Sequence, residues 1–203
     1  MLLILTSLAS FDASCFVGYE TLTCESKVVG LFKDGHFVNE ACGEVIAIFD
    51  NTPFYAESGG QIGDQGTIIL NNESFNVLNT IKFPNGQHAH IIDMKDSNLK
   101  LGLEVSLAVD ESFRNSVACN HSATHLLDQA LKDVLGGHVY QNGSQVTSNN
   151  IRFDFNHFEN VKVEQLIQIE NIIKEKINEK LNVRIYELPI EEAKKEGATA
   201  VFG

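Results

Sequence analysis

Short apolar runs separated by turn-forming residues dominate the first half of the chain. Five such runs occupy residues 28–32, 44–49, 66–70, 75–81 and 88–93. The residues between them include Lys33-Asp34-Gly35, Asp50-Asn51-Thr52-Pro53 and Pro84-Asn85-Gly86. Runs of this length and spacing are typical of strands in an antiparallel sheet that closes into a small barrel. We therefore predict a β-barrel domain over residues 1–110.

From residue 111 onward the apolar positions take a helical period. Ser112 or Ser116 could cap a helix that reaches Leu135, where two glycines would end it. A second helix is predicted over residues 163–181, a strand over each of 151–155 and 183–188, and a short helix between Pro189 and Gly197. The sequence therefore predicts an α+β fold, with the barrel followed by a two-layer α/β domain over residues 111–203.

Charge and cysteine content narrow the functional classes. The net charge is −12, whereas general nucleic-acid binding needs clustered Lys and Arg. Any RNA contact must therefore come from a local basic patch or from a part of the molecule outside this sequence. The four cysteines form no C-x-x-C pair, which favours free thiols in a reducing cytoplasm. The apolar residues 1–8 follow no Lys or Arg and are too short to span a bilayer, so we expect neither secretion nor a membrane partner.

His121-Ser122-Ala123-Thr124-His125 is the first candidate for chemistry. Residues four apart share one face of a helix, so His121 and His125 could approach the same zinc ion. Two unrelated histidines, one buried and one exposed, are the alternative. Ser122 stands where a zinc protease would have its glutamate, which excludes that motif. A zinc site would need further ligands, and no Cys-His pair follows before Gly203.

Gly59, Gly60 and Gln61 belong to a segment with four glycines in eight residues. Such backbone can approach a ligand closely or make a tight barrel turn, and the sequence does not choose between the two. The Gly-Gly-Gln triplet is also found in the loop of translational release factors, but three residues are too short a match to carry that interpretation.

Two later segments carry polar candidates. Gln141 could hold a substrate group through its amide or lie in a solvated turn. Arg152 and Asp154 are predicted to share the polar side of a strand, where they could pair with each other or Arg152 could meet a phosphate.

Taken together, these segments resemble alanyl-tRNA synthetases. The resemblance rests on Phe54-Tyr55-Ala56-Glu57-Ser58-Gly59-Gly60-Gln61-Ile62-Gly63-Asp64, on Asn120-His121-Ser122-Ala123-Thr124-His125-Leu126-Leu127, on the surroundings of Gln141 and Arg152, and on residues 197–203, all in the family's order. It covers the chain from about Phe16 onward. The freestanding deacylases that edit alanine tRNA share this architecture, but residues 55–58 favour the synthetase.

The resemblance implies an enzyme region that hydrolyses Ser-tRNA(Ala) and Gly-tRNA(Ala), within a ligase that attaches alanine to tRNA(Ala) using ATP. An alanine pocket rejects serine and glycine poorly, so a second, hydrolytic site is needed. His121 and His125 would be zinc ligands, and Thr124 and Gln141 would line the amino-acid pocket. Gly59, Gly60 and Gln61 would face that pocket, and Arg152 would contact the tRNA 3′ end. Whether the metal positions the amine or activates water stays open.

The end of the chain shapes two further expectations. Residues 200–203 carry no terminal signature, and the family's Cys-Gly-Gly-Thr-His ligand segment would lie beyond Gly203. We therefore expect weak zinc binding and little activity from this chain alone. A freestanding deacylase and a non-catalytic tRNA-binding module of the same fold are the competing hypotheses, and the oligomeric state is not predicted.

Overall fold

A computed structural model describes residues 13–184 and 188–197 of the protein. The chain divides into two compact units. The first contains the described residues up to His121 together with Ser144–Arg152, and the second contains Ser122–Gly143 and the described residues from Phe153 onward. The domain boundary predicted between residues 110 and 111 stays a prediction.

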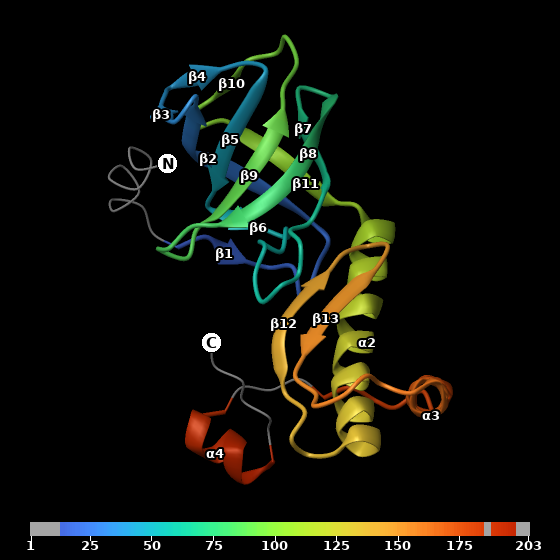
Figure 1. The fold of residues 1–203 in the computed structure, drawn as a ribbon. Helices are drawn as coiled ribbons and strands as arrows, with labels where there is room; N and C mark the ends of the chain where they lie inside the picture. Colours follow the sequence, from blue (N-terminus) through green and yellow to red (C-terminus); the bar gives the residue numbers. More distant parts are fainter. Residues whose placement is uncertain (1–12, 185–187, 198–203) are drawn as a thin grey trace. The chain divides into compact units, whose positions relative to one another are not determined.

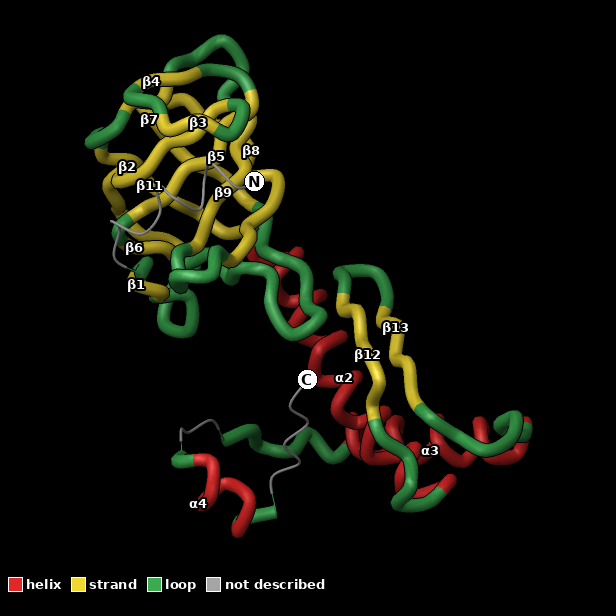
Figure 2. The backbone as a smooth tube through the Cα atoms, turned by 60° about the vertical axis from the view of Figure 1, so that its left-hand side comes forward, coloured by secondary structure: helices red, strands yellow, loops and turns green. Residues whose placement is uncertain are grey.

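Six antiparallel strands close into the barrel of the first unit (Figures 1 and 2). In spatial order they are β11 (Glu104–Val109), β7 (Gly66–Leu70), β8 (Glu73–Lys82), β9 (His88–Asp93), β5 (Glu44–Phe49) and β2 (Thr23–Lys33). β11 pairs with β7 on one side and with β2 on the other, which removes both sheet edges. The predicted α+β fold with a small antiparallel barrel is confirmed.

Short strands extend this barrel at its rims. β3 (His36–Phe37) pairs with β2, and β4 (Glu40–Ala41) pairs with β10 (Leu99–Lys100). At the opposite end of the barrel, β1 (Cys15–Phe16) runs parallel to β6 (Asn51–Thr52) (Figure 1). The loop between β6 and β7, which contains the glycine-rich segment, gathers at the same end as β1.

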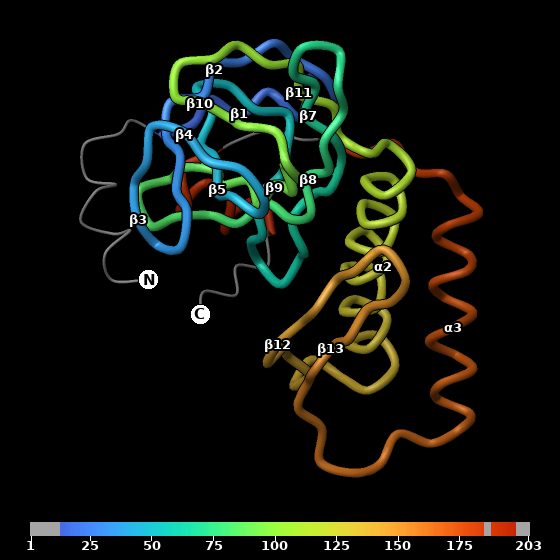
Figure 3. Tube along the Cα trace, turned by 90° about the horizontal axis from the view of Figure 1, so that it is seen from above, coloured from blue at the N-terminus to red at the C-terminus, as the bar shows by residue number. Residues whose placement is uncertain are grey.

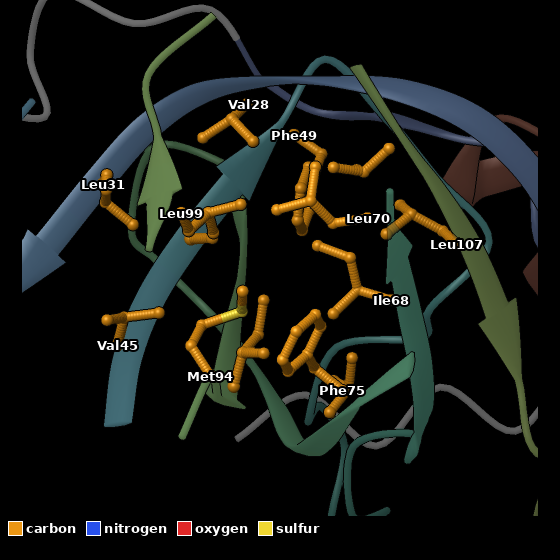
Figure 4. Packing of buried hydrophobic residues seen from close by; sticks show 14 of the residues in the cluster. Val28, Leu31, Val45, Phe49, Ile68, Leu70, Phe75, Met94, Leu99 and Leu107 are labelled. Carbon is orange, nitrogen blue, oxygen red and sulfur yellow. The ribbon is translucent and has the colours of Figure 1, made fainter. Parts of the chain in front are cut away.

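Apolar side chains from all six strands fill the barrel. Because side chains alternate across a strand, every second residue of β7 and β11 points inward, among them Ile68 and Leu107, which are at most 1% exposed. Phe49 and Phe75 approach them from other strands, and Met94 lies just beyond the end of β9 (Figure 4). The same cluster includes Phe54, so the core reaches the start of the candidate loop.

A 25-residue helix, α2 (Glu111–Leu135), follows the barrel. Its first turn is capped by Asp110, whose Oδ1 accepts a 2.9 Å hydrogen bond from the amide of Phe113. The prediction that Ser112 or Ser116 caps this helix is wrong, because both lie within it and the Ser116 hydroxyl donates to the Ser112 carbonyl. Asp110 combines the cap with the favourable interaction between a carboxylate and a helix N-terminus.

Two strands and two helices complete the described chain. β12 (Gln141–Val146) and β13 (Ile151–Phe155) form a hairpin, visible as the separate pair of strands in Figure 2. α3 (Val163–Asn178) lies beside α2 (Figure 3), and Ile169 packs against Ala130 and Leu131. α3 ends three residues before the predicted Leu181. α4 (Ile190–Lys195) lies between Pro189 and Gly197, as predicted.

The strand predicted over residues 183–188 is not formed at residues 183, 184 or 188, and residues 185–187 lie outside the described residues. Within the two described ranges, no helix is long and apolar enough to cross a membrane.

Candidate functional site

A buried ion pair closes the base of the glycine-rich loop. The Asp64 carboxylate is 1% exposed and accepts hydrogen bonds from both Nε and Nη2 of Arg114, with Nε 2.9 Å from each carboxylate oxygen. Asp64 Oδ2 also accepts from the amide of Tyr55 at 2.6 Å, and the Asp64 amide donates to the Tyr55 carbonyl. The loop from residue 55 to residue 64 is therefore pinned at both ends to the first turn of α2.

Arg114 also reaches the N-terminal segment of the described chain. Its Nη1 donates to the carbonyl of Gly18 at 3.0 Å, and its Nη2 donates to the carbonyl of Pro53 at 2.8 Å. One guanidinium thus donates hydrogen bonds to three separate segments of the chain, which its planar arrangement of N–H donors allows. The sequence motifs assign no role to Asp64 or Arg114, although a charged residue inside an otherwise glycine-rich segment is a visible signal.

The tip of the loop is a tight turn at residues 58–61. The amide of each end residue donates to the carbonyl of the other, and Gly59 and Gly60 have φ values of +60° and +83°. Positive φ at both central positions is the pattern of a type I′ turn, which strongly favours glycine. The tip also pairs with β12, because the Gly60 carbonyl accepts from the amide of Val146 at 2.8 Å.

Gly60 has a second requirement that Gly59 lacks. A Cβ at Gly60 would lie 2.4 Å from the Ser144 carbonyl oxygen, whereas a Cβ at Gly59 would meet nothing within 4 Å. We expect Gly59→Ala to cost about 1–2 kcal/mol of unfolding free energy through its positive φ. Gly60→Ala should cost about 1–3 kcal/mol more, because the loop must also move away from β12. Urea denaturation measures both, and equal losses would contradict the close contact with Ser144.

Gln61 connects this loop to the histidine-bearing helix. Its side chain is 6% exposed, and its Oε1 lies 2.5 Å from Nδ1 of His121. A carbonyl oxygen can only accept, so in this arrangement Nδ1 of His121 carries the proton. In a neutral imidazole the other nitrogen, Nε2, then holds the lone pair that a metal ion would use. The structure therefore gives Gln61 a protein partner, and a direct substrate contact for it stays a prediction.

The other predicted residues lie in the second unit or in β13. Thr124 is buried and His125 is exposed, three and four residues after His121 on α2. Gln141 is half-buried at the start of β12, a strand that sequence analysis did not predict. Arg152 and Asp154 are both exposed on β13, as the alternation predicts. Their roles toward substrate or tRNA stay predictions.

The residues present suit part of a zinc site. Imidazole nitrogen is a common zinc ligand, and two histidines one helical turn apart supply two of the four positions of a tetrahedral site. Among the residues that the structure describes, no group of three or more His, Cys, Asp or Glu side chains is placed to hold a metal ion. The Gln61–His121 hydrogen bond is the kind of contact that orients a metal-binding histidine.

Comparison with known proteins gives one family throughout. The model of the family "tRNA synthetases class II (A)" matches residues 5–113. The chain is 50% identical to an alanine–tRNA ligase of Geobacillus kaustophilus over 194 residues, which are 95% of this chain and 22% of the relative. It is 48% identical to those of Bacillus velezensis and Bacillus subtilis over 192 residues each, which are 94% of this chain and 22% of each relative.

The chain thus spans about a fifth of the length of the curated relatives that it matches. The resemblance to alanyl-tRNA synthetases seen in the sequence motifs is confirmed by these identities. Since the family model covers more than half of the 203 residues, the chain belongs to the class II (A) tRNA synthetases.

Proposed function

We propose that this chain is the editing region of an alanine–tRNA ligase and hydrolyses the ester bond of Ser-tRNA(Ala) and Gly-tRNA(Ala). The observation that supports this most directly is the hydrogen bond between Gln61 and His121. It joins the two segments that carry the family resemblance, the glycine-rich loop and the histidine pair, which are 60 residues apart in the chain. A cytoplasmic location fits this function and the four free cysteines.

Each residue has a definite task in this proposal. His121 and His125 would hold a zinc ion, which supplies a positive charge that can orient the substrate amine or lower the pKa of a bound water. Thr124 and Gln141 would pair with the serine hydroxyl. Correctly attached alanine lacks this hydroxyl and could not make these hydrogen bonds, so it would be hydrolysed more slowly than the serine ester. Arg152 would contact a phosphate of the tRNA 3′ end.

A chimera tests the proposal in its full context. This chain would replace the segment that it matches in the Geobacillus kaustophilus alanine–tRNA ligase, and hydrolysis of Ser-tRNA(Ala) would be measured with and without His121→Ala. We expect hydrolysis comparable to the unaltered ligase, and at least a tenfold loss in the variant. A chimera that charges tRNA with alanine but leaves Ser-tRNA(Ala) intact would refute the editing function.

Gln61 should determine how tightly His121 binds zinc. Gln61→Leu removes the acceptor from Nδ1–H and should weaken zinc affinity about 10–100-fold in the chimera, the usual effect of losing such an orienting partner. Gln61→Glu keeps an acceptor and should retain most of the affinity. Competition with a chromophoric chelator measures the affinity independently of activity.

The matched control is Gln65→Leu, because Gln65 is exposed on the same loop. It should leave zinc affinity unchanged. Equal affinities for Gln61→Leu and Gln65→Leu would show that His121 does not depend on Gln61 for its orientation.

A further inference from the structure

An aromatic pocket lies beside the glycine-rich loop, and it contains none of the residues to which the proposed function gives a task. Its volume is about 280 Å³, near the lower end of the range for small-ligand pockets. Three segments of the first unit line it. They contribute Phe16 at the end of β1 with Tyr19 just after it, Tyr55 and Ser58 of the glycine-rich loop, and Lys82 and His88 at the facing ends of β8 and β9. Figure 1 shows these segments at one end of the barrel.

Four rings form the walls of this pocket. The Phe16 ring makes edge contacts with Tyr19 and Tyr55, at centroid distances of 5.0 and 6.3 Å, and lies 5.3 Å from the ring of His88. Phe16 therefore contacts each of the other three rings. Tyr19 is in contact with Phe16 on one side, yet 83% of its surface is exposed to solvent. A large aromatic side chain that is held by a neighbour yet open to solvent can stack on a flat ligand.

The segment that carries Tyr19 is firmly held. Val17 donates to the Thr52 carbonyl, and its own carbonyl accepts from the amides of Glu20 and Thr21, which makes a tight turn around Tyr19. The Gly18 carbonyl accepts from Arg114, the residue that also holds Asp64. Tyr19 therefore loses little backbone freedom when a ligand binds, so the cost of ordering is low.

The polar groups of the pocket suit a nucleotide. Lys82 provides one positive charge and Ser58 a hydroxyl. Burial lowers the pKa of His88, and its Nδ1 donates to the Phe54 carbonyl, so at pH 7 the ring is neutral and adds aromatic surface rather than charge. Stacking rings with a single cation match a nucleobase joined to one phosphate better than a polyanion or an acidic peptide.

We propose that this pocket binds one unpaired nucleobase of a single-stranded RNA 3′ end, with the base stacked on Tyr19 and a phosphate near Lys82. The inference rests on the proposed function, which requires the 3′ end to reach the glycine-rich loop. Ser58 belongs both to the pocket and to the turn that carries Gln61, so a base held here lies next to the segment that contacts His121.

Binding of a short RNA tests the inference on the 203-residue chain. The probe is a 5′-fluorescein single-stranded RNA with the tRNA terminus CCA, followed by fluorescence anisotropy at fixed low salt. Tyr19→Ala should weaken binding about 5–150-fold, the range found for loss of one base–aromatic stack. Tyr19→Phe keeps the ring and should stay within about twofold of the unaltered chain.

Two further measurements separate stacking from charge. The chain has four tyrosines and no tryptophan, so RNA should quench tyrosine emission, and less so in Tyr19→Ala. Lys82→Ala should lower the slope of log affinity against log salt concentration by about 0.7, as expected for one single-strand phosphate contact.

Phe37→Ala is the control, because Phe37 is an exposed aromatic residue on β3, at the other end of the barrel (Figure 1). It should leave RNA binding unchanged. The inference fails if the unaltered chain does not bind the probe, or if Tyr19→Ala binds as tightly as Phe37→Ala. If the chimera with Tyr19→Ala still clears Ser-tRNA(Ala) at the normal rate, the pocket has no role while the editing function stands.

Discussion

Replacing Arg114 by methionine should lower the free energy of unfolding by about 3–5 kcal/mol, because it leaves the buried Asp64 carboxylate without its counter-charge. Methionine retains much of the volume and the apolar stem of arginine, so the loss reports the charge and the hydrogen bonds rather than a large cavity. Urea denaturation with tyrosine fluorescence or circular dichroism measures the change.

The exposed pair Lys100–Glu40 provides the control for this prediction. Its side chains are 54% and 43% exposed, and its N–O distance is 3.1 Å. Lys100→Met should therefore cost less than about 1 kcal/mol, as is usual for surface ion pairs. A double variant, Arg114→Met with Asp64→Asn, should be more stable than the sum of the two single losses predicts, because it removes the unpaired charge. Similar losses of unfolding free energy for Arg114→Met and Lys100→Met would show that the buried Arg114–Asp64 ion pair does not stabilise the fold more than a surface pair does.

The same variant has a consequence at the candidate site. Arg114 fixes the base of the loop through Asp64, and the tip of that loop places Gln61 against His121. Loosening the base should therefore weaken the orientation of His121 even though Arg114 does not contact it. Arg114 is a positioning residue in this sense, and zinc affinity of the chimera is the measurement that separates this effect from lost stability alone.

Local patterns in the sequence predicted the barrel strands that are bounded by turns. The apolar runs at β5, β7 and β9 have the bounds that the structure gives them, because turn residues mark their ends and alternation marks their inward faces. β11 was not predicted, although it closes the barrel. Its sequence, Glu104–Val109, alternates well, but its role depends on pairing with β2, which lies about 80 residues earlier.

The candidate site was only partly predictable, because it also depends on contacts between residues that are far apart in the chain. Two histidines four residues apart are visible locally, and so are consecutive glycines. The strand β12 is polar, and it is recognisable only through its backbone pairing with β13 and with Gly60 and Ile62 of the loop. The Asp64–Arg114 and Gln61–His121 contacts join residues 50 and 60 positions apart, and spacing along the chain carries no information about them.

His90 makes the barrel sensitive to acid. Its ring is fully buried between Phe49 and Phe54, at centroid distances of 4.8 and 5.2 Å. Nδ1 donates to the Ala47 carbonyl at 3.2 Å, which leaves Nε2 to accept from the Thr52 hydroxyl at 2.8 Å. A proton on Nε2 would face that hydroxyl inside an apolar core. Burial therefore lowers the pKa of His90 to about 3.

The direction of the pH dependence follows from this lowered pKa. Between pH 6.5 and 3 the unfolded chain binds a proton at His90 and the folded chain does not, so stability falls as the pH falls through this window and is unaffected above it. The loss is about 1.4 kcal/mol per pH unit, or roughly 4–5 kcal/mol in total. Burial also lowers the pKa of His88, which adds to the loss in the same direction.

We expect the free energy of unfolding to drop by about 2 kcal/mol or more between pH 6.5 and 5, where most carboxylates are still ionised. His90→Gln should remove most of this slope, because glutamine can donate to Ala47 and accept from Thr52 without taking up a proton. His88→Gln should remove a smaller part, because His88 is less deeply buried.

Urea denaturation at several pH values gives the slopes, and the comparison holds even if His90→Gln is less stable at neutral pH. An unchanged slope in His90→Gln would mean that His90 takes up its proton over the same pH range in the folded and unfolded chains, which its two hydrogen bonds and apolar walls argue against.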